Sequence, residues 1–398
     1  MAETFTFILL LLATVMLYLL VAKKLTDTIF TPPMLFLVVG LLVSPLVLNA
    51  LDFNDNQALI LLYAEIALAI TLFTDSASVD FGKVRKNRLP ARLLLIGLPL
   101  TIALGTVVAL VSFAGLSIGE AGLIGAILAP TDASLGQAII QNKHVPERVR
   151  EALDVESGLN DGGSVPFFAL FLVMAQAEAG QVSIASWADF AIEQIGFGVV
   201  VGLVVGFVGA RLLRASIKKE FMPSRLRPIA LISLALIAFF VADAVGGSGF
   251  IGAYVAGLMI AASRLKLTEE LVEFAGAEGE VLDLGVFFIL GIMFVTVLPG
   301  ITWMVILYAI LSLTLVRMLP VWTSLVRSKL RERDKLFIGW FGPRGLASIV
   351  LVMIALQQSE SIHGIGTVVT VVLVTVLISV FAHGVTAAPF ARRYGAQD

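Results

Sequence analysis

Two aspartates stand inside long apolar segments of this chain, where a carboxylate is costly. Asp132 lies in GLIGAILAPTDASLGQAII and Asp161 lies in ESGLNDGGSVPFFALFLVMA, while Arg317 and Arg344 lie in two further apolar segments toward the C-terminus. An ionisable side chain at membrane depth usually lines a water-filled path or pairs with an opposite charge. Acids and bases buried in one apolar chain therefore indicate a site that handles a proton or a small cation.

The run ESGLNDG carries four polar side chains on less than two helical turns. Helical spacing puts Ser157 and Asp161 on one face with Asn160 beside them, and it turns Glu156 toward the next face. Asp161 and Ser157 thus offer oxygen ligands to a hard monovalent cation, while Glu156 faces a different partner. The alternative is a structural polar cluster that holds helices together.

Two of the apolar segments contain helix-breaking residues. Pro130 precedes Thr131 and Asp132 in one segment, and Gly342, Pro343 and Gly345 surround Arg344 in the other. Proline removes a backbone donor, and an interrupted helix exposes two half-helix ends whose dipoles need compensation. Asp132, Thr131 and Arg344 therefore each have a structural alternative to a role in the ion site. Asp132 could complement the positive end of a half-helix, and Thr131 could cap a helix. Arg344 could offset the negative end of the other half-helix.

The composition defines the class of protein. The 398 residues are 59% hydrophobic and 14% charged, with a mean hydropathy of +0.99. Soluble domains are about 45–50% apolar and about 25% charged, so this is an integral membrane protein with short polar loops. The absence of cysteine excludes disulfides and thiolate sites, and the three histidines form no metal-binding motif. The sequence has no cluster of basic residues interleaved with aromatic residues that would indicate binding to nucleic acid, and no cofactor is expected.

Hydropathy predicts about thirteen membrane-spanning helices of roughly 20 residues each. The segments are 5–22, 30–50, 57–79, 91–114, 119–140, 152–177, 187–210, 229–246, 248–262, 281–298, 301–325, 336–357 and 363–390. We expect the first to be a retained helix because it lacks a preceding basic stretch and a small-residue cleavage site. No linker or soluble regulatory domain is predicted, so residues 1–398 are interpreted as a single membrane domain.

The lysines and arginines predict the orientation. With the N-terminus outside, all but two of the 27 bases fall in inside loops, and the exceptions are Arg317 and Arg344. The basic loops lie around 23–24, 83–92, 143–150, 211–227, 264–266, 327–335 and 392–393. Short loops rich in lysine and arginine stay on the cytoplasmic side, which predicts an N-terminus outside and a C-terminus inside.

The two interrupted segments predict an internal repeat. When one helix is set aside as extra, 119–140 and 336–357 occupy corresponding places in two six-helix halves of opposite orientation. Matching interrupted helices in inverted repeats are the best sequence pointer to a transporter's binding site. At 1.5 Å per residue, the two aspartates and two arginines lie roughly 12–15 Å from the inside ends of their segments. The charged residues and the helix breaks are thus predicted to lie at a similar depth in the membrane.

With these motifs in view, the chain resembles a known family over residues 32–394. APTDASLG, ESGLNDG, VRMLPVW, GPRGLA and AHGVTAAP are similar to motifs of the prokaryotic sodium/proton antiporters of the monovalent cation:proton antiporter-1 family, to which the sodium/hydrogen exchangers belong. The resemblance implies a homodimer whose protomers each have a dimerisation bundle, including 1–50 and 187–262, and a core, including 91–177 and 301–391, with two crossed, discontinuous helices.

The resemblance also implies roles for individual residues. Asp161 is the alternating cation ligand and proton carrier, Thr131 and Ser157 are further ligands, and Asn160 braces the crossed chains. The site as a whole includes Asp132.

The resemblance further implies that Glu156 pairs with a core arginine, for which Arg317 is the first choice and Arg344 the second. Asp75 falls where relatives place an acid in the cytoplasmic funnel. Ala133 departs from the family, many of whose members have proline there.

We therefore expect a secondary active antiporter, not an enzyme, that exchanges sodium or lithium for one proton across the prokaryotic inner membrane. Asn160 stands where electrogenic relatives have an aspartate, which predicts electroneutral exchange. We also expect alternating access, in which the core changes sides only when Asp161 is neutralised by a proton or a cation. Three alternatives remain open: a potassium/proton antiporter of the same fold, a channel or sensor, and an intramembrane aspartyl protease. The last would lack Asn160, Ser157 and the two buried arginines.

Overall fold

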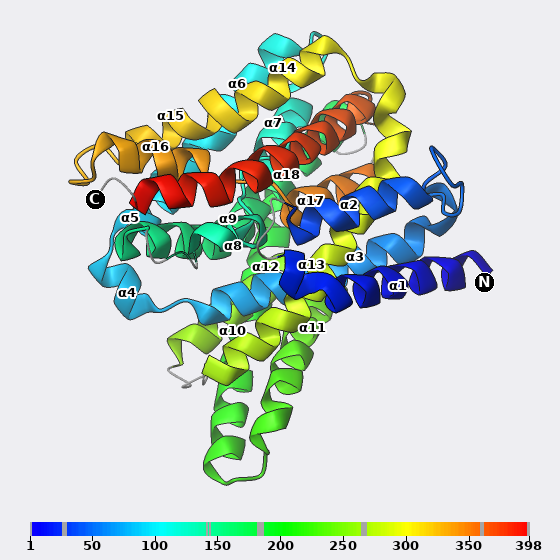
Figure 1. Ribbon diagram of the computed structural model, residues 1–398. Coiled ribbons are helices and arrows are strands. Elements are labelled where there is room, and N and C mark those ends of the chain that lie inside the picture. Colours follow the sequence, from blue (N-terminus) through cyan, green and yellow to red (C-terminus); the bar gives the residue numbers. More distant parts are fainter. Residues whose placement is uncertain are drawn as a thin grey trace.

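A computed structural model describes residues 2–25, 30–140, 142, 145–180, 187–263, 269–358 and 362–395. Across these ranges the chain is helical and has no strand (Figure 1). The predicted bases Lys143, Arg264 and Lys266, together with His144, lie outside the described residues. The elements are α1 (Ala2–Leu25), α2 (Pro32–Val43), η1 (Asn54–Asn56), α3 (Gln57–Ser78), α4 (Phe81–Lys86), α5 (Leu89–Arg92), η2 (Leu93–Gly97), α6 (Leu98–Ser112), α7 (Ile118–Ile127), α8 (Ala133–Ile140), α9 (Glu147–Glu178), α10 (Trp187–Lys218), η3 (Ser224–Leu226), α11 (Arg227–Ala244), α12 (Gly249–Ala262), α13 (Glu269–Val297), η4 (Leu298–Gly300), α14 (Trp303–Leu311), η5 (Ser312–Val316), α15 (Arg317–Ser324), α16 (Glu332–Trp340), α17 (Leu346–Gln357) and α18 (Ile365–Gly395).

Nine helices in the described part of the chain are long and apolar enough to cross a membrane. Four shorter apolar helices, α2, α7, α12 and α17, accompany them. Each of the segments predicted from hydropathy overlaps one of these helices, but several helices are longer than predicted: α9 begins at Glu147, five residues before 152, and α13 begins at Glu269, twelve residues before 281. The polar first turns of α9 extend the helix beyond its apolar stretch, which a hydropathy window does not detect.

Both segments with helix-breaking residues are interrupted in the structure. Residues 128–132 separate α7 from α8, and residues 341–345 separate α16 from α17. Pro130 and Pro343 lie within these stretches and have no backbone N–H to continue a helix. Helix α17 begins directly after Gly345, and α8 begins directly after Asp132.

Two π-helical turns, which we did not predict, lie in the helices that precede the breaks. Residues Leu93–Gly97 form η2 and Ser312–Val316 form η5. A proline ring clashes with the carbonyl four residues earlier, and for Pro99 and Pro320 these carbonyls belong to Leu95 and Val316. The wider π turn accommodates each clash. Helix α15 packs on η2 while α6 packs on η5, so the two kinked segments meet reciprocally.

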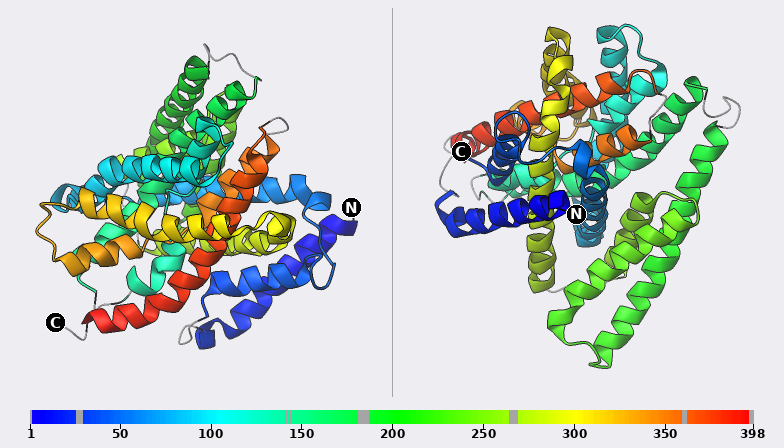
Figure 2. Two further views of the ribbon diagram at one scale, coloured as in Figure 1. Left: turned by 90° about the horizontal axis from the view of Figure 1, so that it is seen from above. Right: turned by 90° about the vertical axis from the view of Figure 1, so that its right-hand side faces the viewer.

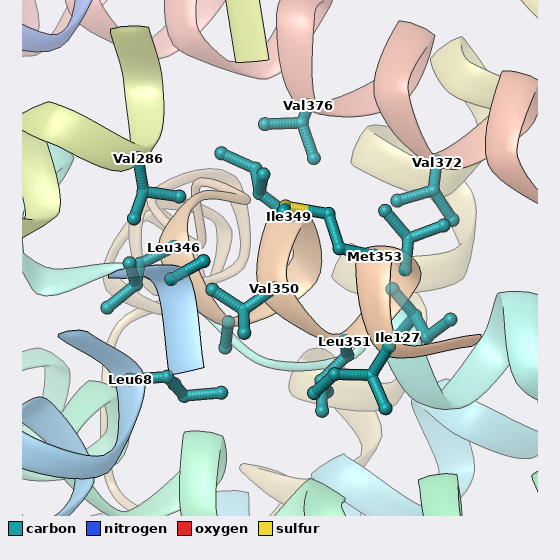
Figure 3. Close-up of a cluster of buried hydrophobic side chains, with 14 of the residues drawn as sticks. Leu68, Ile127, Val286, Leu346, Ile349, Val350, Leu351, Met353, Val372 and Val376 are labelled. Atoms are coloured by element: carbon teal, nitrogen blue, oxygen red, sulfur yellow. The ribbon is translucent and has the colours of Figure 1, made fainter. Parts of the chain in front are cut away.

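Helix α17 lies at the centre of the apolar core. Every residue from Leu346 to Ala355 is buried, which is the pattern of a helix surrounded by protein on all sides. Its neighbours come from α3, α7, α13 and α18, as Figure 3 shows with Leu68, Ile127, Val286 and Val372. The break before α17 is therefore anchored by a rigid, close-packed helix.

Helices α10, α11 and α12 form a second group, in which the hairpin of α10 and α11 extends away from the remaining helices (Figures 1 and 2). Gly198, Gly202 and Gly206 form a face of α10 that lies directly on α12, where added Cβ atoms would approach Ile251, Val255 and Met259 to about 3 Å. The small-residue face therefore serves helix packing within this chain. Helix α12 in turn packs on α3.

Candidate functional site

The two breaks cross each other. The Asp132 N–H donates to the carbonyl oxygen of Pro343 at 2.8 Å, and the Leu346 N–H donates to Asp132 Oδ2 at 2.9 Å. The carboxylate of Asp132 thus satisfies a free donor at the N-terminal end of α17, where the helix dipole favours a negative charge. Gly345 is required here because a Cβ atom would overlap that carboxylate.

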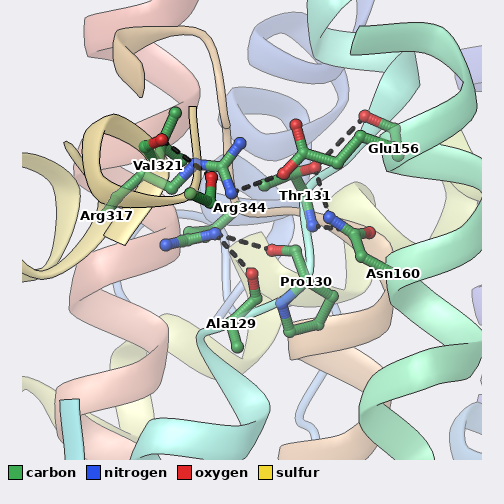
Figure 4. Close-up of polar contacts among 10 residues, drawn as sticks. Ala129, Pro130, Thr131, Glu156, Asn160, Arg317, Val321 and Arg344 are labelled. Carbon is green, nitrogen blue, oxygen red and sulfur yellow. Dashed lines mark hydrogen bonds and ion pairs between the residues drawn. The ribbon is translucent and has the colours of Figure 1, made fainter. Parts of the chain in front are cut away.

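Arg344 makes the reciprocal contact. Its Nη1 donates to the carbonyl oxygens of Ala129 and Pro130, at 2.8 and 2.9 Å, just beyond the C-terminal end of α7 (Figure 4). These carbonyls have no helical partner, and a cation complements the negative end of the half-helix. The arginine side chain is fully buried. Asp132 and Arg344 therefore occupy the opposite helix ends that their structural alternatives assigned to them.

Glu156 pairs with Arg317 and not with Arg344. Arg317 Nη1 lies 2.6 Å from Glu156 Oε1, and each side chain is 3% exposed (Figure 4). Arg317 is the first residue of α15 and directly follows the π turn η5. Gly342 lies against this guanidinium, and a Cβ there would overlap Arg317 Nε. The ion pair thus links α9 to α15 beside the second break.

Thr131, Asn160 and Ser157 form a hydrogen-bonded cluster at the first break. The Thr131 N–H donates to Asn160 Oδ1 at 3.2 Å, and Asn160 Nδ2 donates to Thr131 Oγ1 at 2.7 Å. Thr131 Oγ1 lies 3.2 Å from Ser157 Oγ. One amide therefore holds both the backbone and the hydroxyl of Thr131. The side chain of Asn160 joins the unwound strand to α9.

Asp161 follows Asn160 and is 6% exposed. Its Oδ1 is buried without a hydrogen-bond partner among the described residues. A buried carboxylate oxygen without a partner is costly unless a proton or a cation occupies it. Ser157 is one turn away on the same face of α9, so its hydroxyl and the Asp161 carboxylate line the same side of the helix.

Asp75 of α3 faces Gly158 of α9, with no side chain between them. The two residues line a pocket together with Ser78, Val79, Asp154 and Val155. Asp154 is a further acidic residue that we did not predict, although its spacing of four residues from Gly158 places it one turn away on the same face. The pocket brings two carboxylates to the seam between α3 and α9.

These features define an all-helical membrane protein in which two helix breaks cross beside a buried carboxylate, and Oδ1 of that carboxylate, Asp161, has no hydrogen-bond partner among the described residues. The model of the transmembrane sodium/hydrogen exchanger family matches residues 9–393, so the chain belongs to that family. It is thus a member of a family of antiporters, which are transporters and not enzymes.

The names of related proteins refer to two different cations, potassium and sodium. The chain is 27% identical over 368 residues to a protein named K(+)/H(+) antiporter NhaP2 of Shewanella oneidensis, covering 90% of this chain and 62% of that protein. It is 27% identical over 344 residues to one named Na(+)/H(+) antiporter ApNhaP of Aphanothece halophytica, covering 82% of this chain and 63% of that protein. The chain thus spans less than two thirds of the length of these relatives.

A solved structure shares the fold. The sodium proton antiporter MjNhaP1 from Methanocaldococcus jannaschii superposes with a TM-score of 0.78 at 22% identity, covering 96% of this chain and 99% of the other. At this level of identity the likeness establishes the fold alone.

Proposed function

We propose that this protein exchanges one sodium or lithium ion for one proton at Asp161. The observation that carries the proposal is the buried Oδ1 of Asp161 that has no hydrogen-bond partner in the described part of the chain. Ser157 and Thr131 supply hydroxyl oxygens nearby, and hard monovalent cations prefer oxygen ligands. Desolvation disfavours the charged carboxylate, so Asp161 holds either a proton or a cation.

Obligatory exchange follows if the core changes access only when Asp161 is neutralised by one of the two ions. The paired charges of Glu156 and Arg317 cancel and travel with the core. Asp132 remains at the end of α17, which leaves one titrating carboxylate in the transport step. One cation then replaces one proton, and the exchange is electroneutral.

The moving part is proposed to be the core, including 91–177 and 301–391, which slides against a dimerisation bundle including 1–50 and 187–262. The reciprocal packing of the two π-turn helices supports an inverted repeat of the two halves. We further propose thirteen crossings, an outside N-terminus, a cytoplasmic C-terminus and a homodimer in the prokaryotic plasma membrane. Asp75 and Asp154 attract cations to the cytoplasmic entrance.

The second candidate function is potassium/proton exchange, which the names of several relatives favour. Proteoliposomes with a pH-sensitive dye distinguish the two candidates. Sodium and lithium should each dissipate a preformed pH gradient, and potassium should not. Dissipation by potassium alone would establish the second candidate, and no response to any of the three ions would refute antiport.

A further inference from the structure

One polar face of α18 is not used by the proposed ion site. Ser379, His383 and Thr386 follow one another at helical spacing and face the C-terminal end of α16. Trp340, the last residue of α16, donates from Nε1 to Thr386 Oγ1 at 3.1 Å. Its ring lies against the imidazole of His383, with 5.1 Å between the ring centroids. His383 is 1% exposed. Its hydrogen-bond partners are Ser379 and Trp340, which are not among the proposed ion ligands.

The imidazole of His383 connects the two ends of the second break. The Arg344 N–H donates to Ser379 Oγ at 2.7 Å, and Ser379 Oγ lies 3.1 Å from His383 Nδ1. On the other side, His383 Nε2 lies 2.9 Å from the carbonyl oxygen of Trp340. The backbone from Trp340 to Arg344 is therefore closed into a ring by three hydrogen bonds through Ser379 and His383 of α18.

The partners restrict which nitrogen of His383 donates and which accepts. The carbonyl of Trp340 can only accept, so Nε2 carries the proton. The oxygen of Ser379 already accepts from the Arg344 N–H, which leaves its hydroxyl proton for Nδ1. A neutral imidazole, with one donor and one acceptor, satisfies both contacts. The carbonyl oxygen of Ser379 also lies 2.9 Å from Nδ1, so a charged imidazole that donates from both nitrogens is the rival arrangement.

We propose that His383 is a positioning residue of the ion site, which as a neutral imidazole ties both ends of the unwound strand 341–345 to α18. Arg344 passes this constraint to the first break, because its guanidinium holds Ala129 and Pro130. Those residues directly precede the ligand Thr131. The inference rests on the proposed function because its readout is cation-driven exchange.

Two substitutions of the same residue test the proposal in proteoliposomes. His383→Leu removes both hydrogen bonds and leaves the Trp340 carbonyl without a donor, which should raise the half-saturating cation concentration roughly tenfold. His383→Gln keeps a side-chain N–H for Trp340, so it should recover most of the affinity with an unchanged pH profile. Thr375→Val is the matched control, since the Thr375 hydroxyl is buried on α18 and bonds within its own helix to Val371.

Wild-type exchange is measured in the same vesicles, because its absence would overturn the proposed function and not only the role of His383. With wild-type exchange present, a His383→Leu protein that matches Thr375→Val in half-saturation would overturn the positioning role. A His383→Gln protein that loses exchange would also overturn it, because the retained N–H would then not be sufficient. A shifted pH profile in that protein would overturn it as well, because His383 would then titrate. If His383→Leu does not fold, Ser379→Ala opens the same ring and must raise the half-saturating concentration; an unchanged value would refute the proposal.

Discussion

Replacing Glu156 by glutamine tests whether the pair with Arg317 is structural. The two groups lie 2.6 Å apart with 3% of each side chain exposed, so water cannot compensate for a lost charge. Arg317 Nε and Nη2 have no other hydrogen-bond partner in the described structure. Glu156→Gln therefore leaves a buried guanidinium with its charge uncompensated.

The expected loss of stability is about 3–5 kcal/mol, which is typical when one member of a buried ion pair is removed. We would measure thermal unfolding of the purified protein in detergent by intrinsic fluorescence and by loss of the size-exclusion peak. The midpoints are ranked and not converted to free energies, because a chain of this length need not unfold in two states. Glu156→Gln should unfold at a clearly lower temperature than wild type.

Asp161→Asn is the matched control, because it makes the same chemical change on the same buried helix, at a carboxylate without a hydrogen-bonded partner on Oδ1. Its midpoint should equal or exceed that of wild type. The double variant Glu156→Gln/Arg317→Gln removes both charges and should recover part of the loss. If Glu156→Gln melts like wild type but no longer exchanges ions, the structural role is wrong and Glu156 takes part in transport.

The remaining predictions concern the ion site and the crossing of the breaks. Asp161→Asn should fold and elute as wild type but show no sodium-driven proton movement in proteoliposomes; clear residual exchange would mean that another group carries the proton. Because Asn160 cannot carry a second proton, a potassium–valinomycin potential of either sign should leave the rate unchanged, although each transported net charge would contribute about 2.3 kcal/mol per 100 mV. A rate that follows the potential would show that a second carboxylate, Asp132 first, also exchanges its proton. Asp132→Ala removes the acceptor of the Leu346 N–H, so unfolding should become easier by about 1 kcal/mol, and an unchanged melting curve would contradict the capping role. Gly345→Ala should destabilise the protein more than a surface substitution does, because its Cβ would overlap Asp132; a wild-type melting temperature would show that the crossing can relax.

The sequence by itself determined the features that depend on composition and on local chemistry. Apolar segments separated by short basic loops indicated a membrane protein, and Pro130 and Pro343 marked the two interruptions because proline has no N–H to donate. The spacing of Ser157, Asn160 and Asp161 placed three polar groups on neighbouring positions of one helix. The prolines at 99 and 320 also carried a local signal for the π turns, which we did not use.

Only the tertiary structure decided which charged side chains pair with each other and which lie at helix ends. Glu156 had two candidate arginines at similar depth, and the packing of the helices places Arg317 against it, with Gly342 leaving space beside the guanidinium. The place of Asp132 at the end of α17 likewise depends on two unwound segments, which are about 200 residues apart in sequence and cross at one point. Such contacts arise from packing between segments, and no periodicity within one segment encodes them.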